Sequence, residues 1–113
     1  MQHDSQLEQV ELTIEEAKKS IERMEALKRL RQNRDFVSLL EEGYLQEEAA
    51  RLVLAKAEPA LQSEEQQKML DNMITAVGYY RQYLNKIFQF GNHAQHTMSQ
   101  HEQTRDEIMA EAH

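Results

Sequence analysis

The chain has 113 residues, of which 40% are hydrophobic and 29% are charged, a size and composition that suit one domain with a modest core. Its formal net charge of −7 argues against a general nucleic-acid binder, because such a protein needs a basic surface. The sequence contains no cysteine, which excludes disulfides and thiolate metal sites.

The composition also predicts a fold class. Three Gly, one Pro and many Glu, Gln, Lys, Arg, Leu and Ala favour helix along nearly the whole chain, and no stretch alternates apolar and polar residues. The first residues lack the features of a secretory signal, and no apolar run approaches the ~18 residues needed to span a bilayer. We therefore expect an all-α protein, a single helical domain over residues 1–113, with no membrane partner.

The first expected element occupies residues 1–34, as a helix from about Ser5 to Asn33. Its apolar residues follow an unbroken three-four spacing, which is typical of a helix that packs along another helix. They are Leu7, Val10, Ile14, Ala17, Ile21 and Met24.

Two short helices are expected over residues 35–62. Asp35 can cap the first of them, and Gly43 would end it, because Gly readily adopts the left-handed conformation of a helix end. The buried side of this helix would be Phe36, Val37, Leu39 and Leu40. The second would run from about residue 46 to residue 57, where Pro59 stops it.

A long last helix is expected over residues 63–112. Ser63 followed by Gln66 matches a capping box at its start. Beyond it, six positions at three-four spacing are apolar, namely Leu70, Met73, Val77, Tyr80, Leu84 and Ile87. The pattern then weakens, so residues 91–113 are expected to form a projecting polar end, which either frays in solvent or docks on a partner or a second copy.

The lengths suggest an extended antiparallel hairpin. About fifty helical residues span about 75 Å, and the first helix, about 45 Å long, can cover only part of that length. One copy would then offer more apolar surface than it can bury. The predicted interaction face consists of Leu7, Val10, Ile14, Ile21, Met24, Tyr79, Tyr83, Gly91, Ala94, Met98 and Ile108.

No combination of residues indicates catalysis, so we expect a protein that is not an enzyme and has no cofactor. His93, His96 and His101, with Glu102 and Asp106 nearby, form the one cluster that could hold a metal. Solvated side chains on an open helix are the preferred interpretation, and no metal is expected. The glutamates of residues 41–65 are likewise interpreted as a solvated surface.

A basic cluster follows the first apolar pattern and consists of Lys28, Arg29, Arg31 and Arg34. Cations at a helix C-terminus oppose the negative end of the helix dipole, which is the preferred interpretation. They could instead contact phosphate or the acidic residues 41–65 of a neighbouring copy. The nearby aromatic residues are expected to pack in a core, although Tyr79, Tyr80 and Tyr83 cannot all face inward, so one exposed Tyr could anchor an interface.

The segment Glu42–Val53, together with Lys56–Pro59 and Tyr80–Leu84, resembles a family of short, mostly uncharacterised proteins of tailed bacteriophages. The likeness covers about residues 20–110 and contains no chemical signature. It implies a phage protein from the virion-structure or assembly genes, and it assigns no role to any residue.

Two functions remain open at this point. The first is a helical assembly component of a tailed phage, bound to phage structural proteins or to itself. It would be present in the host cytoplasm during infection and could be incorporated in the virion. The second is an acidic phage protein that binds and inhibits a host enzyme, with its carboxylates in place of nucleic-acid phosphates. A nucleic-acid contact through residues 28–34 is the least favoured.

Overall fold

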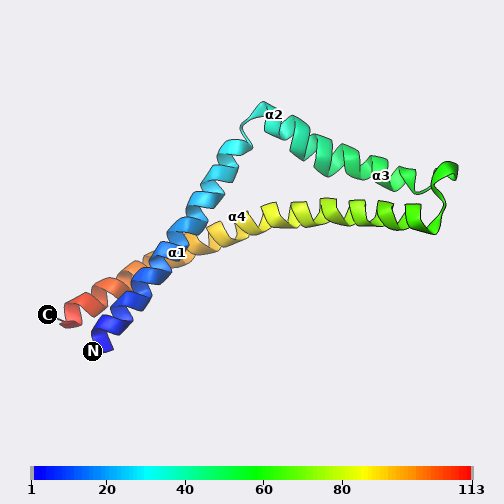
Figure 1. Cartoon of the computed structure of the whole chain (residues 1–113). Helices are drawn as coiled ribbons and strands as arrows, with labels where there is room; N and C mark the ends of the chain where they lie inside the picture. Colours follow the sequence, from blue (N-terminus) through cyan, green and yellow to red (C-terminus); the bar gives the residue numbers. More distant parts are fainter. Residues whose placement is uncertain (1, 113) are drawn as a thin grey trace. The chain divides into compact units, whose positions relative to one another are not determined.

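A computed structural model describes residues 2–112, and every regular element in that range is helical. The elements are α1 (Gln2–Leu30), α2 (Arg34–Phe36), the π-helix η1 (Val37–Glu48), α3 (Ala49–Ala55), the 3₁₀ helix η2 (Pro59–Leu61) and α4 (Glu64–Ala112) (Figure 1). This confirms the predicted all-α class and the very long last helix. None of the described helices has an apolar stretch long enough to cross a bilayer.

The chain divides into two compact units, whereas the sequence suggested one domain. The terminal unit combines the residues up to Leu27 with those from Lys86 onward, and the central unit comprises Lys28–Asn85. Helices α1 and α4 both extend through the boundary between the units.

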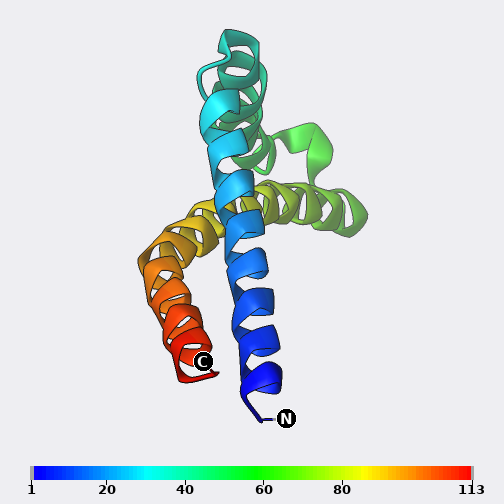
Figure 2. The same ribbon diagram turned by 90° about the vertical axis from the view of Figure 1, so that its left-hand side faces the viewer.

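In the terminal unit, α1 and the last part of α4 lie side by side and antiparallel (Figure 2). Met24, near the end of α1, faces Gly91, whereas Arg105, near the end of α4, lies beside residues 8–18 of α1. Gly91, Ala94 and Ile108 are buried. Residues 91–112 therefore do not project as an unpaired polar end, because their remaining small and apolar residues continue the spacing that α1 needs.

The central unit begins with a tight connection after α1. Asn33 caps the next helix, since its Oδ1 accepts hydrogen bonds from the backbone N–H groups of Asp35 at 2.9 Å and Phe36 at 3.1 Å. The prediction that Asp35 is the cap was therefore wrong by two residues. Both residue types can satisfy the free N–H groups of a first turn, so residue type alone does not show which of the two is the cap.

The predicted helix end at Gly43 is also wrong. The helical run continues without interruption from Arg34 to Ala55, and Gly43 has no positive φ. The run is π-helical over η1, a wide form that is rare at this length. A Cβ at position 43 would lie 2.9 Å from the carbonyl oxygen of Ser38, so glycine serves here for the close approach of that carbonyl.

The rest of the central unit follows the predictions more closely. Pro59 starts η2 after α3 has ended. Ser63 and Gln66 form the predicted capping box, in which Ser63 Oγ accepts from the backbone N–H of Gln66 at 3.1 Å. At 2.5 Å, an ion pair between Lys56 and Asp71 also links the end of α3 to α4.

The core of the central unit lies between α3 with η1 and the first half of α4. Leu52, Leu70 and Val77 form its buried centre, and Leu52 is 1% exposed. Six partly buried side chains surround them: Tyr44, Leu45, Ala49, Ala55, Leu61 and Ile74. The predicted seam residue Met73 is instead 40% exposed, since Ile74 takes its place at the core.

Candidate functional site

Most of the predicted interaction face is occupied within the chain itself. Ile14, Met24, Gly91, Ala94 and Ile108 are buried in the terminal unit. The other members from this unit, Leu7, Val10, Ile21 and Met98, are partly buried. These nine residues therefore contribute to the pairing of α1 with α4, which accounts for their burial without a partner chain.

The two remaining members of the predicted face are exposed on α4. Tyr79 is 67% exposed and Tyr83 is 51% exposed, and they are four residues apart, so they share one side of the helix. Tyr80 instead packs against Tyr44, with ring centroids 5.7 Å apart and planes at 79°. The sequence predicted one exposed tyrosine, whereas the structure exposes two.

Further apolar side chains of the central unit are exposed, and two of them, Leu39 and Leu40, contradict the predicted buried side of the helix after Asp35. Met69 on α4 is 55% exposed, and the others are Leu30, Val53, Leu54 and Met73. Residues 72–80 contain no charged side chain. Protein interfaces are depleted of charge and enriched in Tyr, Met and Arg, so this part of α4 has the composition of a binding surface.

We call Met69, Met73, Tyr79 and Tyr83 the exposed face of α4. Two pairs at four-residue spacing, Met69 with Met73 and Tyr79 with Tyr83, are the signal that could have identified it in the sequence. The apolar spacing of the core, which runs through the neighbouring residues of α4, concealed that signal.

The basic cluster is divided among several elements. Lys28 and Arg29 lie in the last turn of α1, in keeping with the interaction of cations with a helix C-terminus. Arg34 begins α2, and Arg31 forms an ion pair with Glu41 of η1, 2.9 Å from Nε to Oε1. The expected attraction between basic and acidic segments thus occurs within one chain at Arg31.

Glu48, which also belongs to the acidic segment, has a shifted pKa. The pKa of Glu48 lies below its ordinary value, chiefly because of hydrogen bonds from Arg51, and Arg51 in turn has a raised pKa. Arg51 Nε donates to Glu48 Oε2 at 2.9 Å, and Nη2 donates to Oε1. This fork-like pair is on the surface, one turn of helix apart, and it stabilises charge without creating an acid or a base.

The histidine cluster does not converge. His93 and His101 line a hollow of about 240 Å³ with residues of α1 and α4 in the terminal unit, whereas His96 is exposed and does not line it. Over residues 2–112, no group of three or more His, Asp or Glu side chains is arranged to hold a metal ion.

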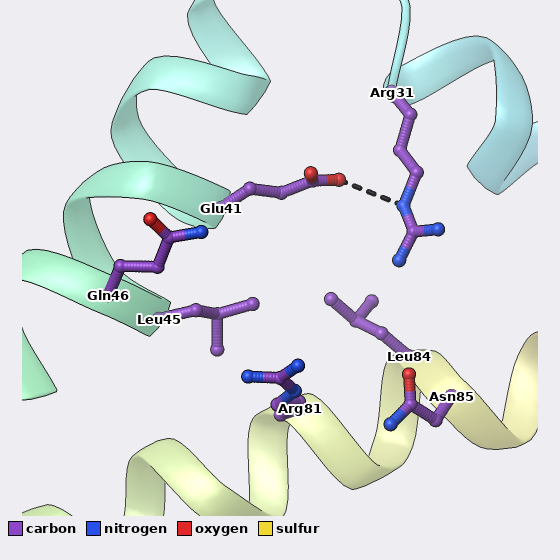
Figure 3. Close-up of a pocket in the computed structure, with 7 residues that line it drawn as sticks. All are labelled: Arg31, Glu41, Leu45, Gln46, Arg81, Leu84 and Asn85. Atoms are coloured by element: carbon purple, nitrogen blue, oxygen red, sulfur yellow. Dashed lines mark ion pairs between the residues drawn. The ribbon is translucent and has the colours of Figure 1, made fainter.

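A smaller hollow of about 130 Å³ lies in the central unit (Figure 3). Arg31 enters it from the connection after α1, and Arg81, Leu84 and Asn85 enter from α4. Its third side is η1, through Glu41, Leu45 and Gln46. Of these residues only Arg31 belongs to the predicted basic cluster, and the others could not be connected with it from the sequence, because the three segments are far apart along the chain.

Comparison of the chain with protein-family models, with curated proteins and with solved structures finds no match.

Proposed function

We propose that this protein is a non-enzymatic helical protein that binds other protein chains, and that it is a minor structural or assembly component of a tailed-phage virion. The observation that carries the proposal is the exposed face of α4, where Tyr79 and Tyr83 lie in solvent beside a stretch free of charge. Tyrosine is enriched among the residues that dominate binding energy at interfaces. The phage assignment is supported by the resemblance of Glu42–Val53.

The partner expected for this face is a phage structural protein or another copy of the chain. When a partner covers a cluster of aromatic and Met side chains, the burial favours binding by about 25 cal/mol per Å² of apolar area removed from water. The seam of α1 does not serve this purpose, since the chain's own α4 covers it.

The alternative of an acidic inhibitor of a host enzyme receives less support. Glu41 and Glu48 carry ion pairs with Arg31 and Arg51 within the chain. Those arginines reduce the negative potential that an imitation of nucleic-acid phosphates requires. Recovery of one host polymerase or nuclease, bound through residues 41–65, would reverse this ranking.

The experiment is to measure incorporation into purified phage particles by quantitative mass spectrometry. The wild-type chain is expected in the particles, and Tyr79→Lys is expected to reduce its incorporation because a charge is placed at the centre of the interface. Leu12→Lys is the matched control, since Leu12 is 62% exposed but lies in the terminal unit.

Two results would contradict the proposal. Absence of the wild-type chain from purified particles would exclude a virion component. Equal incorporation of both variants would show that the exposed face of α4 is not the binding surface. Far-UV circular dichroism of each purified variant shows whether the helices are retained.

A further inference from the structure

The small hollow in the central unit is positively charged, unlike the chain as a whole. Its lining contains two cations, Arg31 and Arg81, and one anion, Glu41, which leaves one net positive charge. Over residues 2–112, no carboxylate forms an ion pair with Arg81. An arginine that faces a cavity without a carboxylate can donate to the oxygens of a bound anion.

Glu41 indicates that the ligand should also bring a hydrogen-bond donor. Its Oε1 is buried and, although it lies 2.9 Å from Arg31 Nε, it accepts no hydrogen bond there, because the N–H is not aligned with it. Arg31 compensates the charge of this oxygen, but its capacity to accept a hydrogen bond is unused, and an O–H or N–H group of a ligand can fill it. The hollow therefore suits a ligand that has both an anionic oxygen and a donor.

The wall that carries Glu41 is itself unusual. Glu41, Leu45 and Gln46 all belong to η1, a π-helix of 12 residues. Since π-helical segments are rare and frequently occur at functional sites, the wide form here is consistent with a binding role. In an α-helix, each residue is rotated by a different angle about the helix axis than in a π-helix. Residues 41, 45 and 46 would then point in other directions and would not line one wall together.

The size of the hollow suits a small group. A volume of about 130 Å³ is larger than one water molecule requires and leaves room for a compact oxyanion. Leu45 and Leu84 point into its centre, and the Gln46 and Asn85 amides stand at its sides (Figure 3). The guanidinium and amide groups of the lining can donate hydrogen bonds to a compact oxyanion.

We propose that this hollow binds a phosphate group that carries one O–H, either inorganic phosphate or a phosphomonoester in its singly protonated form. Arg81 and Arg31 donate to its anionic oxygens, and its remaining O–H donates to Glu41 Oε1. A carboxylate or a sulfate supplies the acceptors but has no O–H at neutral pH, so it leaves Glu41 unsatisfied. The site is separate from the exposed face of α4 and does not depend on the proposed function.

The first test is titration of the full chain with inorganic phosphate, followed by NMR of the Gln46 and Asn85 amides and the Arg81 Nε–H. Arg81→Gln is expected to weaken binding by at least about tenfold, since it removes a charged donor. Arg29→Gln removes the same charge outside the hollow and is expected to change affinity by less than about twofold. Arg81→Lys keeps the charge without the planar fork and should give an intermediate affinity.

The second test exchanges the anion. Wild type is expected to bind phosphate more tightly than sulfate, and Glu41→Gln is expected to bring sulfate affinity up to or above that of phosphate, because the acceptor becomes a donor and Arg31 loses its counter-charge. O-phosphoserine distinguishes the sources when it is titrated at about pH 5, below its second pKa of about 6, so that it keeps its O–H. Tighter binding than that of inorganic phosphate at the same pH indicates a phosphomonoester, and weaker binding indicates the free ion.

Three outcomes would overturn the assignment. The first is that wild type binds phosphate and sulfate with equal affinity. The second is that Arg81→Gln and Arg29→Gln lose equal affinity for phosphate. The third is that phosphate changes NMR chemical shifts only at residues outside the hollow. Circular dichroism of each variant confirms that its helices remain intact, and a variant that loses them is replaced by Arg81→Lys, for which the same comparison with Arg29→Gln applies.

Discussion

Replacement of Gly91 by alanine tests the close packing of α1 on α4 in the terminal unit. A Cβ at position 91 would lie 2.4 Å from Met24 Cβ, 2.6 Å from Met24 Sδ and 2.9 Å from Met24 Cγ. Met24 is fully buried, so its side chain has no solvent-filled space to move into. The nearest atom is also the one fixed to the backbone of α1, and therefore the two helices must move apart.

The expected magnitude follows from two opposing effects. Alanine in a helix interior is favoured over glycine by about 1 kcal/mol. Insertion of a methyl group into a packed interface costs about 1–3 kcal/mol, and the very short contacts place this site in the upper part of that range. The net result expected for Gly91→Ala is a loss of about 1–2 kcal/mol in the free energy of unfolding.

The assay is urea denaturation followed by far-UV circular dichroism, with Gly78→Ala as the matched control. Gly78 lies in the same helix, and a Cβ there would meet nothing within 4 Å. Its replacement is expected to stabilise the protein by about 1 kcal/mol, because only the helix propensity changes. Opposite signs for the two variants support the packing described above.

A Gly91→Ala variant as stable as Gly78→Ala would refute this reasoning. A double-mutant cycle with Met24→Ala provides a further check. Removal of Met24 Cγ and Sδ eliminates two of the three short contacts but leaves Cβ. Gly91→Ala should therefore be less destabilising in that background, though still unfavourable.

Other predictions concern the central unit. Leu52→Ala should destabilise it by about 2–5 kcal/mol in urea unfolding, whereas Leu54→Ala, at a side chain 73% exposed, should change stability by less than about 0.5 kcal/mol. Ser63→Ala removes the capping box and should cost about 0.5–2 kcal/mol in the same assay; no loss would show that the cap is dispensable. Arg51→Gln should raise the pKa of Glu48 in a carboxyl NMR titration, because the hydrogen bonds that lower it are lost. Since that pKa is lowered in the folded chain, the pair stabilises above the unfolded pKa and its contribution disappears as pH falls through the folded value; an unchanged pKa in Arg51→Gln would contradict this.

Several features of the fold could be predicted from the sequence because they depend on interactions between near neighbours. Helix propensity, the stop at Pro59 and the Ser63–Gln66 cap are all satisfied within one or two turns. The same is true of the apolar spacing that identified the buried residues Ile14 and Met24. One local error arose where two residues could perform the same role, as Asn33 and Asp35 could at the start of α2, and another arose at Gly43, where a glycine lies inside a helical run and does not end it.

The candidate sites were less predictable. The exposed face of α4, which includes Met69 and Tyr79, lies next to the core seam of the same helix. The helical period alone cannot show which of two neighbouring apolar stripes another helix covers. The small hollow requires Arg31, Glu41 and Arg81 to meet, and no local pattern connects residues at such separations.

The sequence by itself determined an all-helical chain, its main breaks and most of the residues that avoid water. Only the tertiary structure decided that residues 91–112 cover α1 and that Gly43 lies inside a π-helix. The physical reason is that periodicity specifies that a stripe must be buried, but it does not specify against what. That choice depends on the fit between two surfaces, such as the space that Gly91 leaves for Met24, and such a fit exists only once the helices have come together.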